Sequence, residues 1–409
     1  MNKAAAIGTE AGWHARTVAR PFHRILDRID RGLEAGAIEA ALPDGSHRLL
    51  GGRAQGPVVV MRVVRWRALV KLITGGSVGW YEAWARGDWV ADDPVPLFEL
   101  FMLNRVPLGT VARAGGATRL AIRAWHLLRD NTPHRARANI EAHYDLGNDF
   151  YAEWLDRTMT YSSALFAREQ PLETAQQRKL DAVLARTGAK AGERVLEIGC
   201  GWGSFAATAA RAGVEVHGIT LSREQKAHVD ALALPGVTVS LTDYRAVDGT
   251  YDAVASIEMV EAVGQRWWGA YLDTIERVLK PGGRAALQLI AIADDVFERY
   301  ADNVDFIQRY VFPGGMLISE TRFRALAEAR GLAWTDAHHF GLDYAETLRR
   351  WRERFDAAVA EGRLPERLDG KFIGLWRYYL QYCEGGFRGG GITVLQVTLV
   401  KGERVAPPR

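Results

Sequence analysis

The chain has 409 residues, 48% of them hydrophobic, and a formal net charge of +3 at pH 7; this length can bury the core of one large domain and a smaller companion. Its two cysteines, Cys200 and Cys383, lie far apart in the sequence, which excludes a disulfide framework and a zinc site with the usual ligand spacing. The N-terminus has no apolar leader and no stretch approaches about 18 uncharged apolar residues, so we expect a cytoplasmic protein that does not span a membrane.

The first third of the chain predicts a small domain followed by a basic bridge. Residues 1–104 mix a helix-like start with a short strand, "PVVVMRVV" at 57–64, which indicates a small α+β domain. The segment 105–140 follows a helical period only loosely and is expected to connect two domains. Between residues 101 and 140, seven arginines stand against one aspartate, a local charge of +6 that leaves −3 for the rest. Such a segment either binds anionic groups such as lipid headgroups or is an ordinary solvated helix face. The arginines are Arg105, Arg113, Arg119, Arg123, Arg129, Arg135 and Arg137.

From about residue 185, short apolar segments alternate with helical ones. This alternation is typical of an α/β fold with a doubly wound, mostly parallel sheet. Two later segments, 332–340 and 392–400, could close the far edge of that sheet. Helices are expected to begin at Ser204, at Ser222 and near residue 267. The earlier strands are expected at 194–198, 214–219, 237–241, 251–257 and 284–292.

A glycine-rich turn, "VLEIGCGWGSFA" at 195–206, joins the first of these strands to its helix. Gly199, Gly201 and Gly203 allow a sharp turn and a close approach of the backbone to a ligand. A loop of this kind serves a dinucleotide or S-adenosylmethionine. The acid Glu197 just before the loop favours S-adenosylmethionine, because it can orient the amino acid end of that cofactor. The helix also lacks the third glycine of the dinucleotide pattern, at residue 204.

Polar residues after the next two strands complete the expected cofactor site. The second strand ends in "GITLSREQ" rather than in an acid for the ribose hydroxyls, so Thr220 and Gln225 are the candidates for those hydrogen bonds. Asp243 follows the third strand, where the adenine amino group would be recognised. Its alternative role is that of a polar turn residue.

Seven motifs in order resemble those of the cyclopropane-fatty-acyl-phospholipid synthases and the related mycolic acid cyclopropane synthases. They are "HYDLGNDFY", "MTYSSALF", "VLEIGCGWG", "GITLSREQ", "MVEAVG", "YVFPGGMLIS" and "YYLQYCEGGFR". The resemblance covers about residues 140 to 400. It implies that residues 141–409 form a class I methyltransferase domain, with a Rossmann-like seven-stranded sheet and helical insertions, and that 1–104 is a lipid-associated domain.

The resemblance also implies an activity. A cis double bond of an acyl chain, in a phospholipid, takes the methyl group of S-adenosylmethionine and leaves a carbocation, which aromatic side chains shield from water. Loss of a proton from the new methyl group then closes a cyclopropane ring. The base in this family is thought to be a bound bicarbonate ion.

Carried over residue by residue, the resemblance assigns three groups to that anion. Glu261 of "MVEAVG" matches an acidic ligand, and Ile290 matches a position that contributes backbone. Tyr379 matches the tyrosine whose hydroxyl faces the anion, and Tyr378 takes its place if the register slips.

Two further positions depart from the family pattern. Ser163 stands where the family commonly has cysteine, whose part is played by its backbone. Gln288 stands where histidine is common and would donate through its amide, although it cannot carry a proton as histidine does. Alternatively, the Gln288 amide bonds a neighbouring strand edge. His338 is a second titratable group nearby, or a structural histidine.

For the cofactor pocket the resemblance implies a lid and a floor. Tyr161 and Ser162 would close over the methionine end of the cofactor. Gly199 and Gly201 would lie beneath it. The residues expected around the ribose are Thr220, Leu221 and Gln225. No metal ligands are expected.

Other products and functions remain open. The same first step could give a methylene-branched chain, which a partner reductase would convert to a methyl branch. A methyltransferase acting on a soluble small molecule and a binding protein without catalysis are further alternatives, whereas no base-flipping signature supports nucleic-acid methylation. A phospholipid substrate implies peripheral association with the inner face of the membrane, through the 105–137 segment or the amphipathic residues 13–29. A homodimer is also conceivable.

Overall fold

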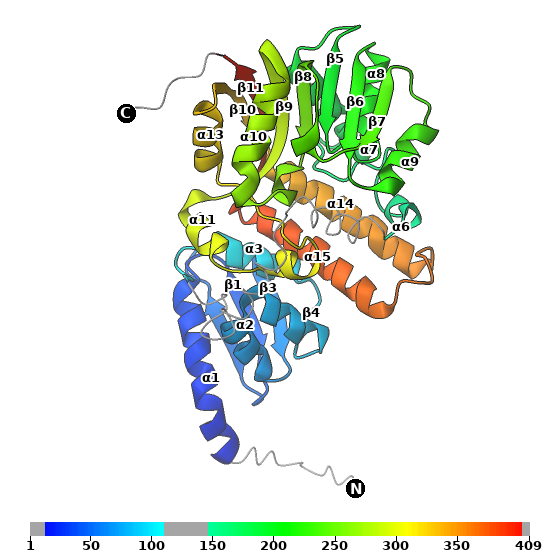
Figure 1. Cartoon of the computed structure of the whole chain (residues 1–409). Helices are drawn as coiled ribbons and strands as arrows, with labels where there is room; N and C mark the ends of the chain where they lie inside the picture. The colour runs from blue at the N-terminus through cyan, green and yellow to red at the C-terminus, as the bar shows by residue number, and fades with distance from the viewer. Residues whose placement is uncertain (1–12, 110–145, 403–409) are drawn as a thin grey trace. The chain divides into compact units, whose positions relative to one another are not determined.

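The computed structural model describes residues 13–109 and 146–402 (Figure 1). The chain divides into two compact units whose boundary falls within residues 110–145. Most of the predicted basic bridge therefore lies outside the described residues, as do six of its seven arginines. Residues 105–109, which include Arg105, form turns.

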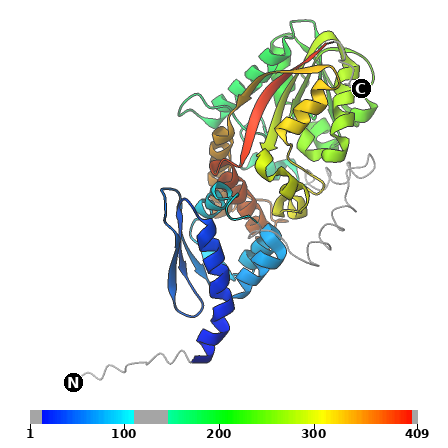
Figure 2. The same cartoon turned by 90° about the vertical axis from the view of Figure 1, so that its left-hand side faces the viewer.

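The N-terminal unit is a four-stranded sheet with three helices, which confirms the predicted α+β domain. The sheet order is β2-β1-β3-β4, and β1 runs parallel to β3. Figure 2 shows α1 alongside this sheet, where it contacts β2. Stacked Trp80 and Trp89 rings, 4.5 Å apart, anchor α2 to β4. The strands are β1 (Ala37–Ala41), β2 (His47–Gly51), β3 (Val58–Val63) and β4 (Trp89–Ala91), and the helices are α1 (Trp13–Gly32), α2 (Arg67–Ala85) and α3 (Val95–Leu103).

The C-terminal unit contains the predicted seven-stranded sheet, in the order β10-β11-β9-β8-β5-β6-β7. Strands β5 to β9 pair in parallel, and β11 inserts antiparallel between β9 and β10, so the two last strands do close the far edge. The strands are β5 (Arg194–Ile198), β6 (Glu215–Thr220), β7 (Val237–Leu241), β8 (Tyr251–Ile257), β9 (Leu279–Ile292), β10 (Leu332–His339) and β11 (Ile392–Lys401). Strand β9 begins at Leu279 rather than at residue 284, because Leu279 pairs with Tyr251 across a bulge.

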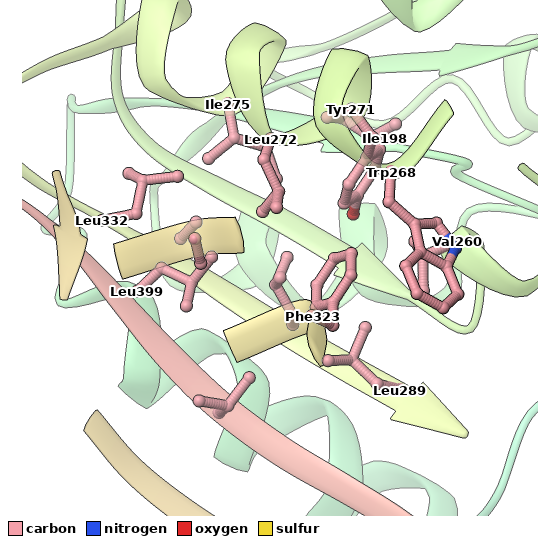
Figure 3. Packing of buried hydrophobic residues seen from close by; sticks show 14 of the residues in the cluster. Ile198, Val260, Trp268, Tyr271, Leu272, Ile275, Leu289, Phe323, Leu332 and Leu399 are labelled. Carbon is pink, nitrogen blue, oxygen red and sulfur yellow. The ribbon is translucent and has the colours of Figure 1, made fainter. Parts of the chain in front are cut away.

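Helices cover both faces of this sheet. The alternation within β5 shows why: Val195 packs in the cluster under α7 and α8, whereas Leu196 packs in the cluster under α10 and α13. Figure 3 shows the second cluster, which includes Leu272 of α10, Phe323 of α13 and Leu289 of β9. Each such large apolar side chain stabilises the fold by about 1.5–3 kcal/mol when fully buried.

The remaining elements follow the same order along the chain. The covering helices are α7 (Leu172–Thr187), α8 (Ser204–Arg211), α9 (Arg223–Ala231), α10 (Trp268–Val278) and α13 (Glu320–Glu328). The other helices are α6 (Asn148–Ala152), α11 (Asp294–Ala301), α12 (Phe306–Tyr310), α14 (Gly341–Ala360) and α15 (Gly370–Arg388), with 3-10 turns η1 (Tyr244–Ala246), η2 (Val260–Ala262) and η3 (Gln265–Trp267). Helices α14 and α15 pack against each other. The strand order reverses at β5, and the crevice at the carboxyl ends of strands beside such a reversal is where α/β proteins bind ligands.

Candidate active site

The glycine-rich loop lies between β5 and α8, as the sequence predicts. Gly199, Gly201 and Gly203 have φ angles of 83°, 52° and 85°, in the left-handed region that favours glycine. A Cβ atom on Gly199 would lie 2.8 Å from Met259 Cγ, and one on Gly203 would lie 2.9 Å from Val229 Cγ2. A Cβ atom on Gly201 would meet nothing within 4 Å. Packing therefore excludes a side chain at the first and third positions, and only backbone conformation does so at the second.

One cavity opens beside this loop and gathers the predicted cofactor residues. Gly203 does not line the cavity, because it lies behind the loop at the N-terminus of α8. Lys179, Glu258 and Met259, which were not among the predicted cofactor residues, do line it. The predicted residues in its wall are Tyr161, Ser162, Glu197, Gly199, Gly201, Thr220, Leu221, Gln225 and Asp243.

The wall formed by β6 and α9 is held by a short hydrogen-bond relay. The Thr220 hydroxyl donates to Gln225 Oε1 at 2.8 Å, and this bond fixes the orientation of the Gln225 amide. Ser222 caps α9 by accepting from the Gln225 backbone N–H. Asp243 caps η1 and forms a bidentate ion pair with Arg245. Asp243 is therefore a polar turn residue, and it also lines the cavity.

Beneath the loop lies a buried acid opposite a buried base. Glu197 is 3% exposed, and its Oε2 atom has no hydrogen-bond partner among the described residues. Burial raises the pKa of Glu197 well above its usual value. Lys179 is fully buried and donates to Ser162 Oγ at 2.5 Å, and burial lowers its pKa to about 8. A buried acid with one unpartnered oxygen beside a glycine loop fits a ligand that brings a cationic amino group, as S-adenosylmethionine does, because such a group favours the charged form of the acid.

A second carboxylate, Glu258, lies at the end of β8 and was missed in the sequence. Three donors converge on it: the Ser163 backbone N–H at 2.9 Å, Gln288 Nε2 at 2.7 Å and the Tyr344 hydroxyl at 2.7 Å. Its φ angle is 49°, in the region that non-glycine residues rarely adopt. The available signal was an acid directly after a strand of the predicted sheet, three residues before Glu261.

The orientation of Gln288 is fixed from the opposite side. Gln288 on β9 pairs in register with Gln396 on β11, and Gln396 Nε2 donates to Gln288 Oε1 at 3.0 Å. Arg186 Nε donates in turn to Gln396 Oε1 at 3.1 Å. The amide thus bonds a neighbouring strand through its oxygen, which is the alternative role predicted for Gln288, and it bonds the Glu258 carboxylate through its nitrogen.

Glu261 and Ile290 form a separate contact. The Ile290 backbone N–H donates to Glu261 Oε1 at 2.5 Å, while Glu261 Oε2 is buried with no partner among the described residues. Burial raises the pKa of Glu261 to about 8, and the charge of Glu258 contributes in the same direction. Glu261 is therefore mainly protonated at neutral pH.

The structure separates the predicted tyrosines from the Gln288 amide. The Tyr379 hydroxyl lies 2.8 Å from that of Tyr161, and Tyr378 packs on Phe306 with ring centroids 4.8 Å apart. Tyr344, from the first turn of α14, is the tyrosine that bonds the same carboxylate as Gln288. His338 is exposed on β10 and lies outside the site.

Aromatic rings surround Tyr161 at the edge of the cavity. Tyr151, Trp154 and Trp351 lie with ring centroids 5.4–5.5 Å from that of Tyr161, and all three are fully buried. Such rings exclude water and present π-faces that can stabilise a positive charge. Among the described residues, no group of three or more His, Cys, Asp and Glu side chains could hold a metal ion.

Three of the groups that the resemblance assigned to a bicarbonate ion donate to protein carboxyl groups instead. The Ser163 N–H and the Gln288 amide bond Glu258, and the Ile290 N–H bonds Glu261. An anion placed among them would lie beside the Glu258 carboxylate, with those donors already engaged. The residues present therefore do not fit a bound bicarbonate.

Known proteins with similar sequences are methyltransferases and cyclopropane synthases that act on lipids. A family model described as mycolic acid cyclopropane synthetase matches residues 131–397. Tuberculostearic acid methyltransferase UfaA1 of Mycobacterium tuberculosis is 38% identical over 358 residues, covering 81% of this chain and 80% of that protein. Cyclopropane-fatty-acyl-phospholipid synthase of Escherichia coli is 34% identical over 336 residues, covering 81% of this chain and 85% of that protein.

Solved structures agree with the sequence comparison. Mycolic acid cyclopropane synthase CmaA1, complexed with SAH and CTAB, has a TM-score of 0.60 and 31% identity, covering 65% of this chain and 98% of its own. Coclaurine N-methyltransferase, at 22% identity and a TM-score of 0.54, shares the fold.

Proposed function

The chain belongs to the mycolic acid cyclopropane synthetase family, and on that premise we propose that it methylates the double bond of an unsaturated fatty acyl chain carried by a phospholipid. As a member it is an S-adenosylmethionine-dependent methyltransferase. The observation that carries the proposal is that one cavity combines the glycine loop, the carboxylate of Glu258 and Tyr161 with its shell of buried rings.

The cofactor part of this cavity has the chemistry that S-adenosylmethionine requires. Bound there, the cofactor supplies an electrophilic methyl group on a sulfonium centre. Glu197 offers an unpaired oxygen to its amino group, and the backbone of Gly199 and Gly201 allows close approach. Thr220 and Gln225 present a pre-oriented pair of polar groups at the neighbouring strand end.

The acyl part must protect a carbocation. Addition of a methyl group to one carbon of the double bond leaves a positive charge on the other, which any nearby water would quench. The Tyr161 ring lines the cavity and presents a π-face that can stabilise a positive charge, and the buried rings of Tyr151, Trp154 and Trp351 pack around it and exclude water from that side. The Tyr161–Tyr379 hydroxyl pair is satisfied internally and is not a free nucleophile.

The cation has two outcomes of equal mass. If a proton leaves the new methyl group at once, the freed electrons close a cyclopropane ring. If a hydride first moves from the methylated carbon to its neighbour, the cation becomes tertiary, and loss of a methyl proton then leaves a methylene branch.

We favour the methylene branch. Three donors occupy the lone pairs of the Glu258 carboxylate, so it can accept a proton only from a restricted direction. Restricted proton transfer lengthens the life of the first cation and lets the hydride shift compete. The 38% identity to a protein named tuberculostearic acid methyltransferase supports the same choice. A separate reductase would then be needed to give a methyl branch.

Expression in a bacterium that lacks its own cyclopropane synthase tests the proposal. We expect fatty acid methyl esters one CH₂ heavier than the unsaturated chains, with proton NMR showing an exocyclic methylene. Cyclopropane protons alone would refute the branch but keep the methyl transfer, and no heavier chain would refute both.

A matched pair of glycine variants controls for the cofactor site. Gly199→Ala pushes a Cβ atom to 2.8 Å from Met259, whereas Gly249→Ala, also at positive φ, has no atom within 4 Å. The first should lose the heavier chains, and the second should keep them.

A further inference from the structure

We propose that Glu258 is the base of this site, a carboxylate built into the chain that takes the place of a bound bicarbonate ion. The inference rests on the proposed methylation of an acyl double bond. In the proposed step a proton leaves the transferred methyl group and binds a Glu258 oxygen. The electrons of the broken C–H bond form the new bond of the product, so the positive charge that the sulfonium centre brought leaves as that proton.

The contacts of Glu258 identify it as an ionised acceptor. A backbone N–H can only donate, and so can the nitrogen of an amide. The Ser163 N–H and Gln288 Nε2 both point at Glu258 Oε1, and the Tyr344 hydroxyl donates to Oε2. With these three donors Glu258 accepts at both of its oxygens, as an ionised carboxylate does.

A chain of hydrogen bonds fixes which atom of the Gln288 amide faces Glu258. The Arg186 guanidinium can only donate, so Gln396 must present its oxygen to Arg186 and its nitrogen to Gln288. Gln288 must then present its oxygen to Gln396 and its nitrogen to Glu258. The ion pair of Arg186 with Asp336, at 2.8 Å, holds the first member of the chain. The polarity is therefore fixed over four residues, and its end point is a carboxylate.

Position and strain point the same way. Glu258 lines the cavity of the cofactor loop, whereas Glu261 does not. The left-handed backbone at Glu258 is unfavourable for any residue with a Cβ atom, and strain of this kind is found where a site needs one side chain in one place. Burial raises the pKa of Glu258, which makes the carboxylate a stronger base, while the hydrogen bond from Gln288 and the charge of nearby Lys179 act in the opposite direction.

Removal and rescue of the carboxylate test the proposal. The purified full chain is assayed with S-adenosylmethionine and vesicles of an anionic phospholipid with oleoyl chains, in buffer purged of carbon dioxide. We expect wild-type activity to be the same within about twofold with and without added bicarbonate. Glu258→Gly should lose about 100-fold or more, the range for removal of a general base. Formate or bicarbonate should raise the activity of Glu258→Gly by at least about tenfold. The reason is that the variant leaves a space of the size of a carboxylate, lined by donors.

Two controls separate chemistry from folding. Ala233→Gly relieves a similar backbone angle, φ 47°, at an exposed position far from the cavity, and should leave activity unchanged. Glu258→Gln keeps the volume, so its loss of activity should not be rescued by small anions. Calorimetry should show S-adenosylmethionine bound equally, within about threefold, by wild type and both Glu258 variants.

Three outcomes would overturn the inference. A wild type that needs added bicarbonate would show an external base, and the proposed function would survive. Glu258→Gln or Glu258→Gly with more than about a third of wild-type activity would exclude the carboxylate. A wild type that binds S-adenosylmethionine but methylates no acyl chain would refute the proposed function, and this inference with it.

Discussion

The coupling between Gln288 and Gln396 can be tested by a double-mutant cycle with leucine. Both residues are fully buried, and their amides bond each other at 3.0 Å. Gln288→Leu leaves a Glu258 oxygen without its amide donor and leaves the Gln396 amide nitrogen with only a longer contact, 3.4 Å, to the Lys179 carbonyl. A hydrogen bond to a charged group contributes about 1.5–3 kcal/mol, and an orphaned buried group costs about 1–3 kcal/mol. Since leucine regains some apolar burial, the free energy of unfolding should fall by about 3 kcal/mol.

Gln396→Leu should destabilise less. It leaves Gln288 Oε1 unpaired, but Arg186 keeps its ion pair with Asp336, so about 1–2 kcal/mol is expected. The double variant removes both amides together and should fall short of the sum by at least about 1 kcal/mol, since contacting pairs couple by about 0.5–3 kcal/mol.

Denaturant unfolding followed by circular dichroism measures these changes, provided that the slope with denaturant is unchanged. Activity adds a second readout, because Gln396→Leu removes the donor that fixes the orientation of the Gln288 amide beside Glu258. We expect kcat to fall about tenfold with the KM for S-adenosylmethionine unchanged. Additivity within about 0.3 kcal/mol, together with unaltered kcat, would refute the proposed polar chain.

Three further predictions concern titration, the tyrosines and membranes. Burial raises the pKa of Glu261 from 4.5 to about 8, so between these pH values the folded wild type binds one more proton than the unfolded chain, and its free energy of unfolding falls as the pH rises. Glu261→Gln lacks this titration, so its free energy of unfolding relative to wild type should rise from pH 5 to 8, by at most about 5 kcal/mol. Thermal melts at each pH measure the difference. Tyr344→Phe removes a donor to the carboxylate and should lower kcat about tenfold, whereas Tyr379→Phe breaks only a bond between hydroxyls and should cost about 1 kcal/mol of stability with a smaller kinetic effect; equal kinetic effects would contradict this assignment. Vesicle flotation should show binding that requires anionic lipid and weakens with salt, and substitution of the arginines within 105–137 should weaken it; binding indifferent to salt would remove the electrostatic account.

No helix within the two described ranges is long and apolar enough to cross a bilayer. Separately, we propose that the chain reaches a phospholipid substrate by association with the membrane surface. A homodimer, and a partner reductase that would act on a methylene-branched product, are likewise proposals.

Much of the fold was determined by local patterns in the sequence. Strands β5, β7 and β8 were predicted with their observed bounds, because each is a short apolar run between turn residues. The glycine loop could also be predicted from the sequence, because glycine at alternate positions indicates a backbone with positive φ angles, and the structure has them. The bounds of β6, β10 and β11 differ by one residue at one or both ends, and those of β9 differ most, because a bulge lets Leu279 pair before the proline and glycines that follow it.

The reactive centre was decided by tertiary structure. Glu258 is bonded by Ser163, Gln288 and Tyr344, which lie 95, 30 and 86 residues from it in the chain. Which of several tyrosines reaches a carboxylate depends on how α14 and α15 pack at the edge of the sheet, and no periodicity encodes that. The polarity of the Gln288 amide depends on Gln396, 108 residues away on an antiparallel neighbour. A sequence specifies side chains, but the partners of a buried charge are fixed only when the elements that carry them are packed together.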